Sequence, residues 1–421
     1  MPIINIIGIG ADGLSGLRPE LVQMIHSADF LAGGERHLRL LDSAGGQRFI
    51  IKDNLGDLLG ELSRRHPEQR CVVLGSGDPL FYGIGSLIAG TLGSNLVRIE
   101  PAVSSMQLAF ARAGLSWQHA MLATIHGRDL RPNVLPLLGR KLIGLFTHDG
   151  DSPAAVARFF LQFELAAYEA FVSENLGADN ERVSHWPDLQ ELAQQHFSAL
   201  NYLILRRTNY PCAIAEIEHR RALAPGVPDD AFARPSEGQE VMTRQEVRSI
   251  LLGKLGPTRA GDTVWDIGAG LGTVAVEIAV LRPDVEVVAV ERDPGRAVFL
   301  RQNRERFDAY NIQVVEGTAP VVLDGEKERP QVIFLGGSGD QLSAILEFTF
   351  SRLRPGGRFL ANFVTLENLM AFVHKLEESQ WKFDVTEIHI ARSDNLAGLT
   401  GLKPHRGVYL VCADKPEAQH E

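Results

Sequence analysis

The chain has 421 residues, more than one hydrophobic core usually supports, so two domains of about 200 residues are expected. A formal net charge of -10 gives no global positive field that would attract nucleic acid or anionic lipid. The isolated cysteines Cys71, Cys212 and Cys412 argue against a disulfide framework and a structural metal site. Without a signal peptide or a bilayer-length apolar run, the chain is predicted to be cytoplasmic, with no membrane partner.

The first half of the chain alternates short runs rich in Val, Ile and Leu with longer amphipathic segments. Strands are predicted at residues 3–9, 71–74, 141–146 and 202–206. Helices are predicted at residues 19–27, 105–113 and 153–163. The alternation indicates an α/β fold with a largely parallel sheet, in which ligands bind at the carboxyl ends of the strands.

The alternation breaks at residues 208–238, where Pro and Gly gather among mixed charges. This Pro-rich segment is predicted to link a first domain, residues 1–207, to a second, residues 239–413, which a polar tail at 414–421 follows. The run His219-Arg220-Arg221 within the linker is either a weak binding site for substrate carboxylates or a solvated patch.

A fresh α/β pattern follows the linker. Strands are predicted at residues 263–267, 285–290, 312–315, 332–335 and 358–364, with a final pair at 385–390 and 407–411. Helices are predicted at residues 243–255, 273–280 and 295–307. Thr243 and Glu246 have the spacing of a capping box, which places the start of the first of these helices at Thr243.

The most informative motif follows the buried strand that ends in Asp266. Gly268, Gly270 and Gly272 alternate there, and Thr273 begins a helix. Glycines of this kind are expected to let a ligand lie against the backbone, and the helix N-terminus offers unpaired N–H groups to a carboxylate. Asp266 either binds an amino group of the ligand or braces the glycine loop.

A second acid, Glu291, closes the next strand, where it is expected to accept both hydroxyls of a ribose. The segment Gly317-Thr318-Ala319 after the third strand would receive an adenine. An NAD dehydrogenase is the rival interpretation, but its fingerprint is GxGxxG, and the GxGxG spacing here favours S-adenosylmethionine (AdoMet). The alternative without a ligand is a plain strand–helix turn beside a solvated acid.

The N-terminal half opens with a literal GxGxxG at Gly8, Gly10 and Gly13. A fingerprint for NAD requires a helix directly after the loop and an acid closing the next strand. Gly16 and Pro19 precede any clear helix, and Asp29 comes before an apolar run rather than after one. The motif is therefore interpreted as a false match to NAD binding.

Several other segments of this half carry a resemblance to a known family. They are Leu74-Gly75-Ser76-Gly77-Asp78-Pro79-Leu80-Phe81-Tyr82, Glu100-Pro101-Ala102-Val103-Ser104-Ser105-Met106-Gln107-Leu108-Ala109, His126-Gly127-Arg128, and Ser173-Glu174-Asn175-Leu176-Gly177 with Glu181-Arg182. With the opening glycine loop, they resemble the tetrapyrrole methylases, the class III AdoMet methyltransferases, and within them the branch that methylates C5 of precorrin-type intermediates. The resemblance implies a bilobal fold in which Gly75, Gly77, Asp78, Pro79, Leu80, Ser104 and Ser105 help to line the AdoMet site.

The C-terminal half resembles class I Rossmann-like AdoMet methyltransferases, and in particular the decarboxylating C15 branch. The residues that carry this second resemblance are Gly226-Val227-Pro228-Asp229-Asp230-Ala231-Phe232, Met242-Thr243-Arg244-Gln245-Glu246-Val247-Arg248, Phe334-Leu335-Gly336-Gly337-Ser338-Gly339 and Asn362-Phe363-Val364-Thr365-Leu366-Glu367-Asn368. Both halves, in this order, resemble the fused precorrin-6Y C5,15-methyltransferase (decarboxylating) family over nearly the whole chain.

The resemblance implies a bifunctional enzyme of cobalamin biosynthesis with one AdoMet per domain. It would methylate precorrin-6Y or precorrin-6B at C5 and C15 and decarboxylate the C12 acetate to give precorrin-8; the alternative is the same chemistry on cobalt-precorrins. No catalytic residue is assigned, because the macrocycle and AdoMet carry the reactivity. The partner is a tetrapyrrole polycarboxylate rather than nucleic acid, and a homo-oligomer is expected.

Three side chains are candidates for positioning the carboxylates of the substrate. Arg244 and Arg248 are one helical turn apart and so are expected on one face, although a solvated helix face would have the same spacing. His126 would orient a propionate or serve as a hydrogen-bonded structural histidine. The rivals from other classes are a nonenzymatic AdoMet sensor, an oxidoreductase and a nucleic-acid methyltransferase, the last disfavoured by the acidic balance.

Overall fold

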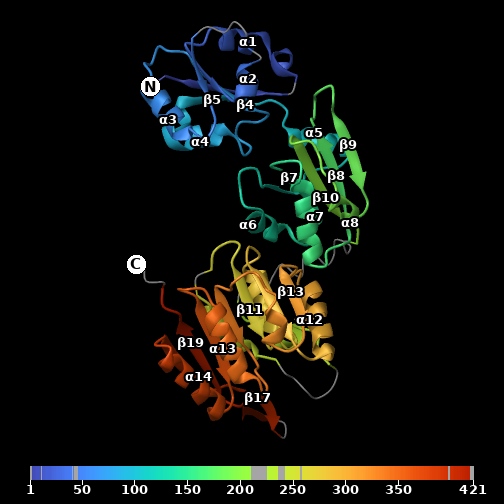
Figure 1. Ribbon diagram of the computed structural model, residues 1–421, viewed down its shortest axis with the longest axis vertical. Coiled ribbons are helices and arrows are strands. Elements are labelled where there is room, and N and C mark those ends of the chain that lie inside the picture. The colour runs from blue at the N-terminus through green and yellow to red at the C-terminus, as the bar shows by residue number, and fades with distance from the viewer. Residues whose placement is uncertain are drawn as a thin grey trace. The chain divides into compact units, whose positions relative to one another are not determined.

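The computed structural model describes residues 2–10, 12–39, 41, 46–209, 225–235, 242–256, 258–396 and 399–417. Most of the expected linker, with His219-Arg220-Arg221, and the end of the expected tail lie outside the described residues. The chain divides into two compact units (Figure 1). Unit 1 comprises Met1–Arg128, Lys141–Arg158 and Ala167–Thr208, and unit 2 comprises Asp129–Arg140, Phe159–Ala166 and Asn209–Glu421.

Unit 1 begins with a fully parallel five-stranded sheet in the order β3-β2-β4-β1-β5. Its strands are β1 (Ile4–Ile9), β2 (Phe30–Gly33), β3 (Gln47–Ile50), β4 (Cys71–Ser76) and β5 (Val97–Glu100). Its helices are α1 (Pro19–His26), α2 (Glu35–Leu38), α3 (Leu55–Ser63) and α4 (Ile84–Leu92), with 3₁₀ turns at Gly13–Gly16 and Ser94–Leu96. Apolar side chains of α1 and α2 pack on one face of the sheet and those of α3 and α4 on the other.

The second sheet of unit 1 has the order β6-β7-β10-β8-β9 and is mixed. Its strands are β6 (Met121–Thr124), β7 (Leu142–Phe146), β8 (Tyr168–Glu174), β9 (Arg182–Trp186) and β10 (Asn201–Arg207). Only β6 and β7 are parallel, so the expectation of a largely parallel sheet is wrong for this part. Short connections explain the difference, because β8 and β9 form a hairpin and a parallel pair would need a long crossover. Helices here are α5 (Ser105–Ala113), α7 (Ser152–Gln162) and α8 (Leu189–Leu192).

Unit 2 is built on a seven-stranded sheet in the order β13-β12-β11-β14-β15-β19-β16. Its strands are β11 (Thr263–Ile267), β12 (Glu286–Glu291), β13 (Ile312–Glu316), β14 (Val332–Leu335), β15 (Arg358–Phe363), β16 (Lys382–Ile388) and β19 (Val408–Asp414). The first five are parallel, and β19 pairs antiparallel with β15 and β16. This is the doubly wound arrangement that the alternating pattern predicts.

Helices cover both faces of this sheet. They are α10 (Gln245–Gly253), α11 (Thr273–Leu281), α12 (Pro294–Arg306), α13 (Leu342–Arg352) and α14 (Leu366–Glu378), with 3₁₀ turns at Asp229–Ala231 and Val321–Leu323. Core residues of α10, α11 and α12 gather on one face, and those of α13 and α14 on the other. Alternate residues of the central strand, Val264 and Trp265, enter the two opposite cores, which explains why β11 is buried along its whole length. Unit 2 also contains α6 (Leu130–Val134) and a 3₁₀ turn at Leu135–Leu137.

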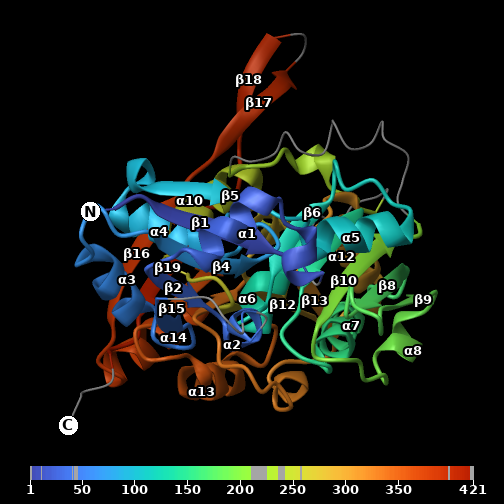
Figure 2. The ribbon, with the colours of Figure 1, turned by 90° about the horizontal axis from the view of Figure 1, so that it is seen from above.

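A hairpin that the sequence did not predict, β17 (Ala391–Leu396) with β18 (Leu399–Pro404), lies between β16 and β19 in the chain. Figure 2 shows it extending from the body of its unit. Among the described residues, no helix is long and apolar enough to cross a membrane.

Part of the expected linker is packed into unit 2. Val227 and Phe232 are buried in the core, and the backbone N–H groups of Gly226 and Val227 donate to the carboxylate of Glu277 on α11 at 2.7 and 3.0 Å. The helix that follows begins at Gln245 after an Arg244 N-cap without a side-chain cap bond. The predicted capping box of Thr243 and Glu246 is therefore wrong.

Candidate functional site

The parallel strands of unit 2 bring together, at their carboxyl ends, the residues predicted to bind AdoMet, the methyl donor. This end of the sheet is called the donor edge. Ile267 pairs with Val290 and Leu335, and Glu291 pairs with Glu316, so the loops after β11, β12, β13 and β14 are neighbours. Backbone hydrogen bonds of 2.9 Å tie these loops together, from Gly268 to Val290, from Gly317 to Glu291 and from Gly336 to Ile267. Ala319 is buried within this edge, and the carbonyl of Thr318 accepts from Val322.

Glu291 is buried and holds the glycine loop. Its two carboxylate oxygens accept from the backbone N–H groups of Gly270, at 2.8 Å, and Asp293, at 2.9 Å. Each oxygen has a second lone pair, so the same carboxylate retains acceptor capacity for a ligand hydroxyl. The interpretation of Glu291 as a solvated acid at a strand end is excluded by its 3% exposure.

Asp266 is the more unusual of the two acids. It is fully buried, and neither of its carboxylate oxygens has a hydrogen-bond partner within bonding geometry. Burial raises the pKa of Asp266 to about 7, the backbone N–H of Ala275 opposes that rise, and the charge of Glu291 adds to it. A buried, unpaired carboxylate is costly in a fold, and a cationic ligand would offset that cost.

The glycines of this loop serve a different purpose from the one that the sequence suggests. A Cβ on Gly268 would overlap the carbonyl oxygen of Gly337, and a Cβ on Gly272 would lie 2.7 Å from Leu300 on α12. Gly268, at φ +75°, and Gly270, at φ +59°, also adopt the left-handed conformation. The expectation that a ligand occupies the Cβ space is therefore corrected at Gly268 and Gly272, where the protein itself fills that space. Thr273, the first residue of α11, is buried directly after this loop.

In unit 1 the corresponding edge joins the loops after β1, β4 and β5. Gly77 donates to the carbonyl of Ile9 at 2.9 Å, and its own carbonyl accepts from Ala102 at 3.1 Å. A Cβ on Gly77, which has φ +59°, would lie 2.9 Å from the Cα of Ser104. Because β1 lies between β4 and β5, Gly77 bridges all three loops and brings the two predicted donor segments together.

The remaining predicted donor residues of unit 1 shape these loops. Asp78 accepts from the backbone N–H of Leu80 at 2.9 Å, and a Cβ on Gly75 would lie 3.6 Å from the ring of Pro79. Ser104 is buried and caps α5 in a capping box with Gln107. Ser105 is exposed at the first position of the same helix.

His126 and its neighbours lie after β6. The Nδ1 atom of His126 lies 3.2 Å from the carbonyl oxygen of Thr147, and its ring lies 5.6 Å from that of His148. Since a carbonyl only accepts, Nδ1 carries the proton of this bond. His126 is thus hydrogen-bonded, as its structural interpretation requires, and it is also exposed.

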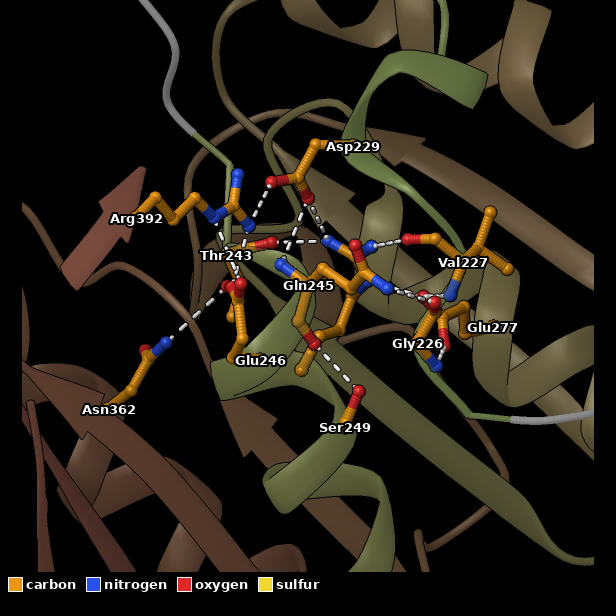
Figure 3. Close-up of polar contacts among 11 residues, drawn as sticks. Gly226, Val227, Asp229, Thr243, Gln245, Glu246, Ser249, Glu277, Asn362 and Arg392 are labelled. Carbon is orange, nitrogen blue, oxygen red and sulfur yellow. Dashed lines mark hydrogen bonds and ion pairs between the residues drawn. The ribbon is translucent and has the colours of Figure 1, made fainter. Parts of the chain in front are cut away.

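Arg248 does not act as the predicted carboxylate clamp. It is fully buried, and its guanidinium donates to Glu277 at 2.5 Å, to Asp229 at 3.2 Å and to the carbonyls of Val227 and Thr243. Figure 3 labels these four partners together with Arg392 of β17, which donates to Asp229 at 2.8 Å and to Glu246 at 2.6 Å. Both of Arg248's carboxylate partners belong to the protein, so the cation holds residues 226–232 on α10 and α11.

The other predicted clamp, Arg244, lies at the N-cap of α10 and is partly buried. The backbone N–H of Arg248 donates to its carbonyl at 2.8 Å. As the N-cap, Arg244 has an extended backbone with ψ 153°, so its side chain does not follow the helical spacing from which a face shared with Arg248 was expected.

Two buried polar side chains were missed in the sequence. Glu277 lies in an otherwise apolar helix, and an acid in such a helix signals a buried cation partner, here Arg248. His37 of α2 is buried beside Ser76, whose Oγ lies 3.2 Å from its Nε2. Burial lowers the pKa of His37 to about 4, with a smaller effect from the charge of Arg36. No periodicity or motif pointed to it.

Comparison with known proteins agrees with this geometry. The family model of Tetrapyrrole (Corrin/Porphyrin) Methylases matches residues 4–193, and that of the Precorrin methyltransferase domain matches residues 231–415. A Cobalt-precorrin-6B C(15)-methyltransferase (decarboxylating) of Salmonella typhi is 34% identical over 45% of this chain and 96% of its own length. A Cobalt-precorrin-7 C(5)-methyltransferase of Salmonella typhimurium is 34% identical over 44% of this chain and 90% of its own.

One relative matches both halves at once. The Precorrin-6Y C(5,15)-methyltransferase [decarboxylating] of Sinorhizobium sp is 33% identical over 416 residues, covering 96% of this chain and 94% of that protein. A match of this extent spans both candidate donor edges and the packed segment before α10. The chain therefore belongs to the precorrin-6Y C(5,15)-methyltransferase (decarboxylating) family.

Proposed function

We propose that the chain methylates precorrin-6Y at C5 in unit 1 and at C15 in unit 2, where it also removes the C12 acetate carboxylate, with one AdoMet site in each unit. The family relationship makes the chain a methyltransferase of cobalamin biosynthesis. The domain limits that we propose are residues 1–207 for C5 methylation and residues 239–413 for C15 methylation and decarboxylation, with the packed residues 226–232 supporting the second.

The proposal of an AdoMet site in unit 2 depends on one observation, the pair of buried acids Asp266 and Glu291 beside a glycine loop in the left-handed conformation. Asp266 lacks a hydrogen-bond partner, and burial raises its pKa. AdoMet carries an ammonium and a sulfonium, and it supplies a methyl group that is activated for transfer to carbon. The pyrophosphate of NAD is anionic and would meet an uncompensated acid here, so the charge of the site favours AdoMet.

Both units would use their residues to hold and orient rather than to donate protons. In unit 2, Glu291 fixes the loop through Gly270 and keeps acceptor capacity for the ribose, while residues 317–319 form the wall proposed for the adenine. In unit 1, Gly77 and Ser104 fix the loops after β4 and β5, which we propose enclose the second donor. The acceptor carbon belongs to an electron-rich macrocycle, so alignment and exclusion of water are what the protein has to supply.

The division of labour is supported by relatives with a single activity each. The C(15) and C(5) relatives each match less than half of this chain. Those relatives are named for cobalt-precorrins, whereas the relative that matches both halves is named for precorrin-6Y. We therefore propose the metal-free macrocycle as the substrate.

The test is an incubation of the full chain with AdoMet and either precorrin-6Y or its cobalt complex, followed by mass spectrometry. We expect two methyl additions and loss of one carbon dioxide from the metal-free substrate. In the Gly270→Val variant we expect C15 methylation to disappear and C5 methylation to remain, because a branched residue at φ +59° distorts only the loop in unit 2. Loss of both methylations in a folded variant would refute two independent sites.

A further inference from the structure

The loop after β4 ends in a backbone conformation that large side chains rarely adopt. Tyr82 has φ +55°, in the left-handed region that normally favours glycine. The hydroxyl of Tyr82 donates to the carbonyl of Leu122 at 3.0 Å, and its ring contacts Phe81 and Phe146 at centroid distances of 4.9 and 5.8 Å. The surrounding contacts therefore hold Tyr82 in this conformation.

The contacts that hold Tyr82 in this conformation do not bury its ring. Tyr82 is 48% exposed, although Phe81 and Phe146 beside it pack against the core of the second sheet. The contacts of Tyr82 with Leu122, Phe81 and Phe146 hold the residue in place, but they do not require nearly half of it to be exposed. Backbone strain such as that at Tyr82 concentrates at sites that bind ligands.

A guanidinium lies over the exposed ring. The Cζ atom of Arg128 is 5.9 Å from the ring centroid of Tyr82, within the range of a cation–π contact. A turn closed by the Arg128 N–H and the Ile125 carbonyl, at 3.1 Å, holds this arginine, with Gly127 at φ +65° inside the turn. Among the residues that the structure describes, no carboxylate forms an ion pair with Arg128, and its side chain is exposed.

We propose that Tyr82 and Arg128 receive the tetrapyrrole at the C5 site. The exposed part of the Tyr82 ring would pack against the conjugated macrocycle, and the planar fork of Arg128 beside it would bind one of its carboxylates. A planar polyanion needs both kinds of contact, and both residues lie in loops that follow strands, Tyr82 after β4 of the first sheet and Arg128 after β6 of the second. The inference rests on the proposed C5 activity of unit 1 and adds the residues that select its substrate.

The test measures both steps on the full chain, with C15 methylation as the internal reference. We expect Arg128→Gln to raise the KM for the tetrapyrrole in C5 methylation about ten- to hundredfold, from the loss of charge-assisted hydrogen bonds. Arg128→Lys should recover only part of this loss, because it keeps the charge without the fork. Tyr82→Leu should raise the same KM about tenfold, and Tyr82→Phe should stay close to the wild type, because it keeps the ring.

Matched measurements separate substrate binding from a structural role. In Arg128→Gln we expect no change in three quantities: the KM for AdoMet in C5 methylation, the melting temperature and the rate of C15 methylation. The control is Arg64→Gln, which changes an exposed arginine at the C-cap of α3 and should also leave these three quantities unchanged. An unchanged tetrapyrrole KM in Arg128→Gln overturns the inference, as does an equal rise in the KM for AdoMet. If Tyr82→Leu fails to fold, Arg128→Gln alone decides. Absence of C5 methylation in the wild type would instead refute the proposed function.

Discussion

The two candidate donor edges differ in how they handle negative charge. In unit 2, Asp266 and Glu291 are both buried, and Asp266 has neither a hydrogen bond nor a counterion within the described residues. In unit 1, the acid at the end of β5 is Glu100, which pairs with Arg18 at 2.7 Å, and the buried groups nearby, His37 and Ser104, are neutral. The edge in unit 2 thus has a buried carboxylate available to a cationic ligand, whereas the edge in unit 1 positions its loops by backbone hydrogen bonds. The stabilities of the two units should then change with pH in opposite directions.

The largest effect that would separate the units is the loss of Arg248. In Arg248→Met, Glu277 stays buried without its cation, and unit 2 should lose about 3–5 kcal/mol of stability. Hydrogen exchange resolved by peptide should show lost protection in unit 2 and unchanged protection in unit 1. Lys254→Met, which removes an exposed ion pair with Asp384, should change little. Equal loss of protection in unit 1 would show that the two units do not fold independently.

Asp266→Asn tests directly whether the buried carboxylate of Asp266 binds the cationic donor. With a folded-state pKa of about 7, against 3.8 when unfolded, the native state binds more protons between these values, so stability falls as pH rises through this window. The variant should therefore be more stable than the wild type above pH 7, by as much as about 4 kcal/mol. AdoMet affinity at this site should rise with pH through 7 in the wild type only, by calorimetry. A pH slope that survives in Asp266→Asn would rule out this acid as its source.

The opposite sign is expected in unit 1, at His37. Its folded-state pKa of about 4 lies below the unfolded value of 6.5, so the unfolded chain binds more protons between them. Stability should then be lost as pH falls from 6.5 to 4, by up to about 3 kcal/mol, and this component should be missing in His37→Gln. Chemical denaturation across this range measures it, with His66→Gln as the exposed control. Identical pH profiles in wild type and His37→Gln would exclude His37.

Glu291→Gln probes the second acid of unit 2 without changing its volume. It should weaken AdoMet binding there by about 1.5–3 kcal/mol, from lost charge-assisted hydrogen bonds to the ribose and a loosened Gly270 loop. The donor site of unit 1 should be unaffected in the same titration. Glu316→Gln is the matched control, because Glu316 pairs in register with Glu291 but forms an ion pair with Arg301. Unchanged affinity in Glu291→Gln would remove the ribose assignment.

These comparisons show which parts of the molecule the sequence could predict. The strands of unit 2 and the edge with Asp266 and Glu291 follow from local signals, namely apolar runs that end in glycines and acids. In the second sheet of unit 1, strands β7 and β10 were predicted, but the mixed strand order was not, and β9 was missed because it is largely exposed and lacks an apolar run. The β17–β18 hairpin escaped for the same reason, since its described side chains are almost all exposed.

The errors at the sites share a physical cause. Helical spacing indicates which residues share a face, but not whether that face is solvated, so Arg248 was taken as a substrate clamp although Glu277 and Asp229 already bind it. The reason given for Gly268 failed because its packing partner, Gly337, belongs to a loop after another strand. Contacts between segments distant in sequence decide both cases, and only Glu277 carried a local warning.

The smallest expected effect separates two neighbouring serines of unit 1 that the sequence treats alike. Ser104 is buried and caps α5 with Gln107, whereas Ser105 is exposed. Ser104→Ala should therefore cost about 1 kcal/mol of stability, as the loss of an N-cap usually does, and Ser105→Ala should cost little. Denaturant unfolding measures both changes.

AdoMet affinity in unit 1 supplies the second half of this comparison. If the hydroxyl of Ser105 contacts the donor, Ser105→Ala should weaken binding without a change in stability. Ser104→Ala should weaken binding only if loss of the helix cap also loosens the loop at Gly77, which packs against Ser104. Equal loss of stability in both variants would contradict the assigned cap. A loss of affinity confined to Ser104→Ala would instead show that the buried serine contacts the donor. The donor sites of the two units would then be more alike, because each would bind AdoMet through a buried side chain.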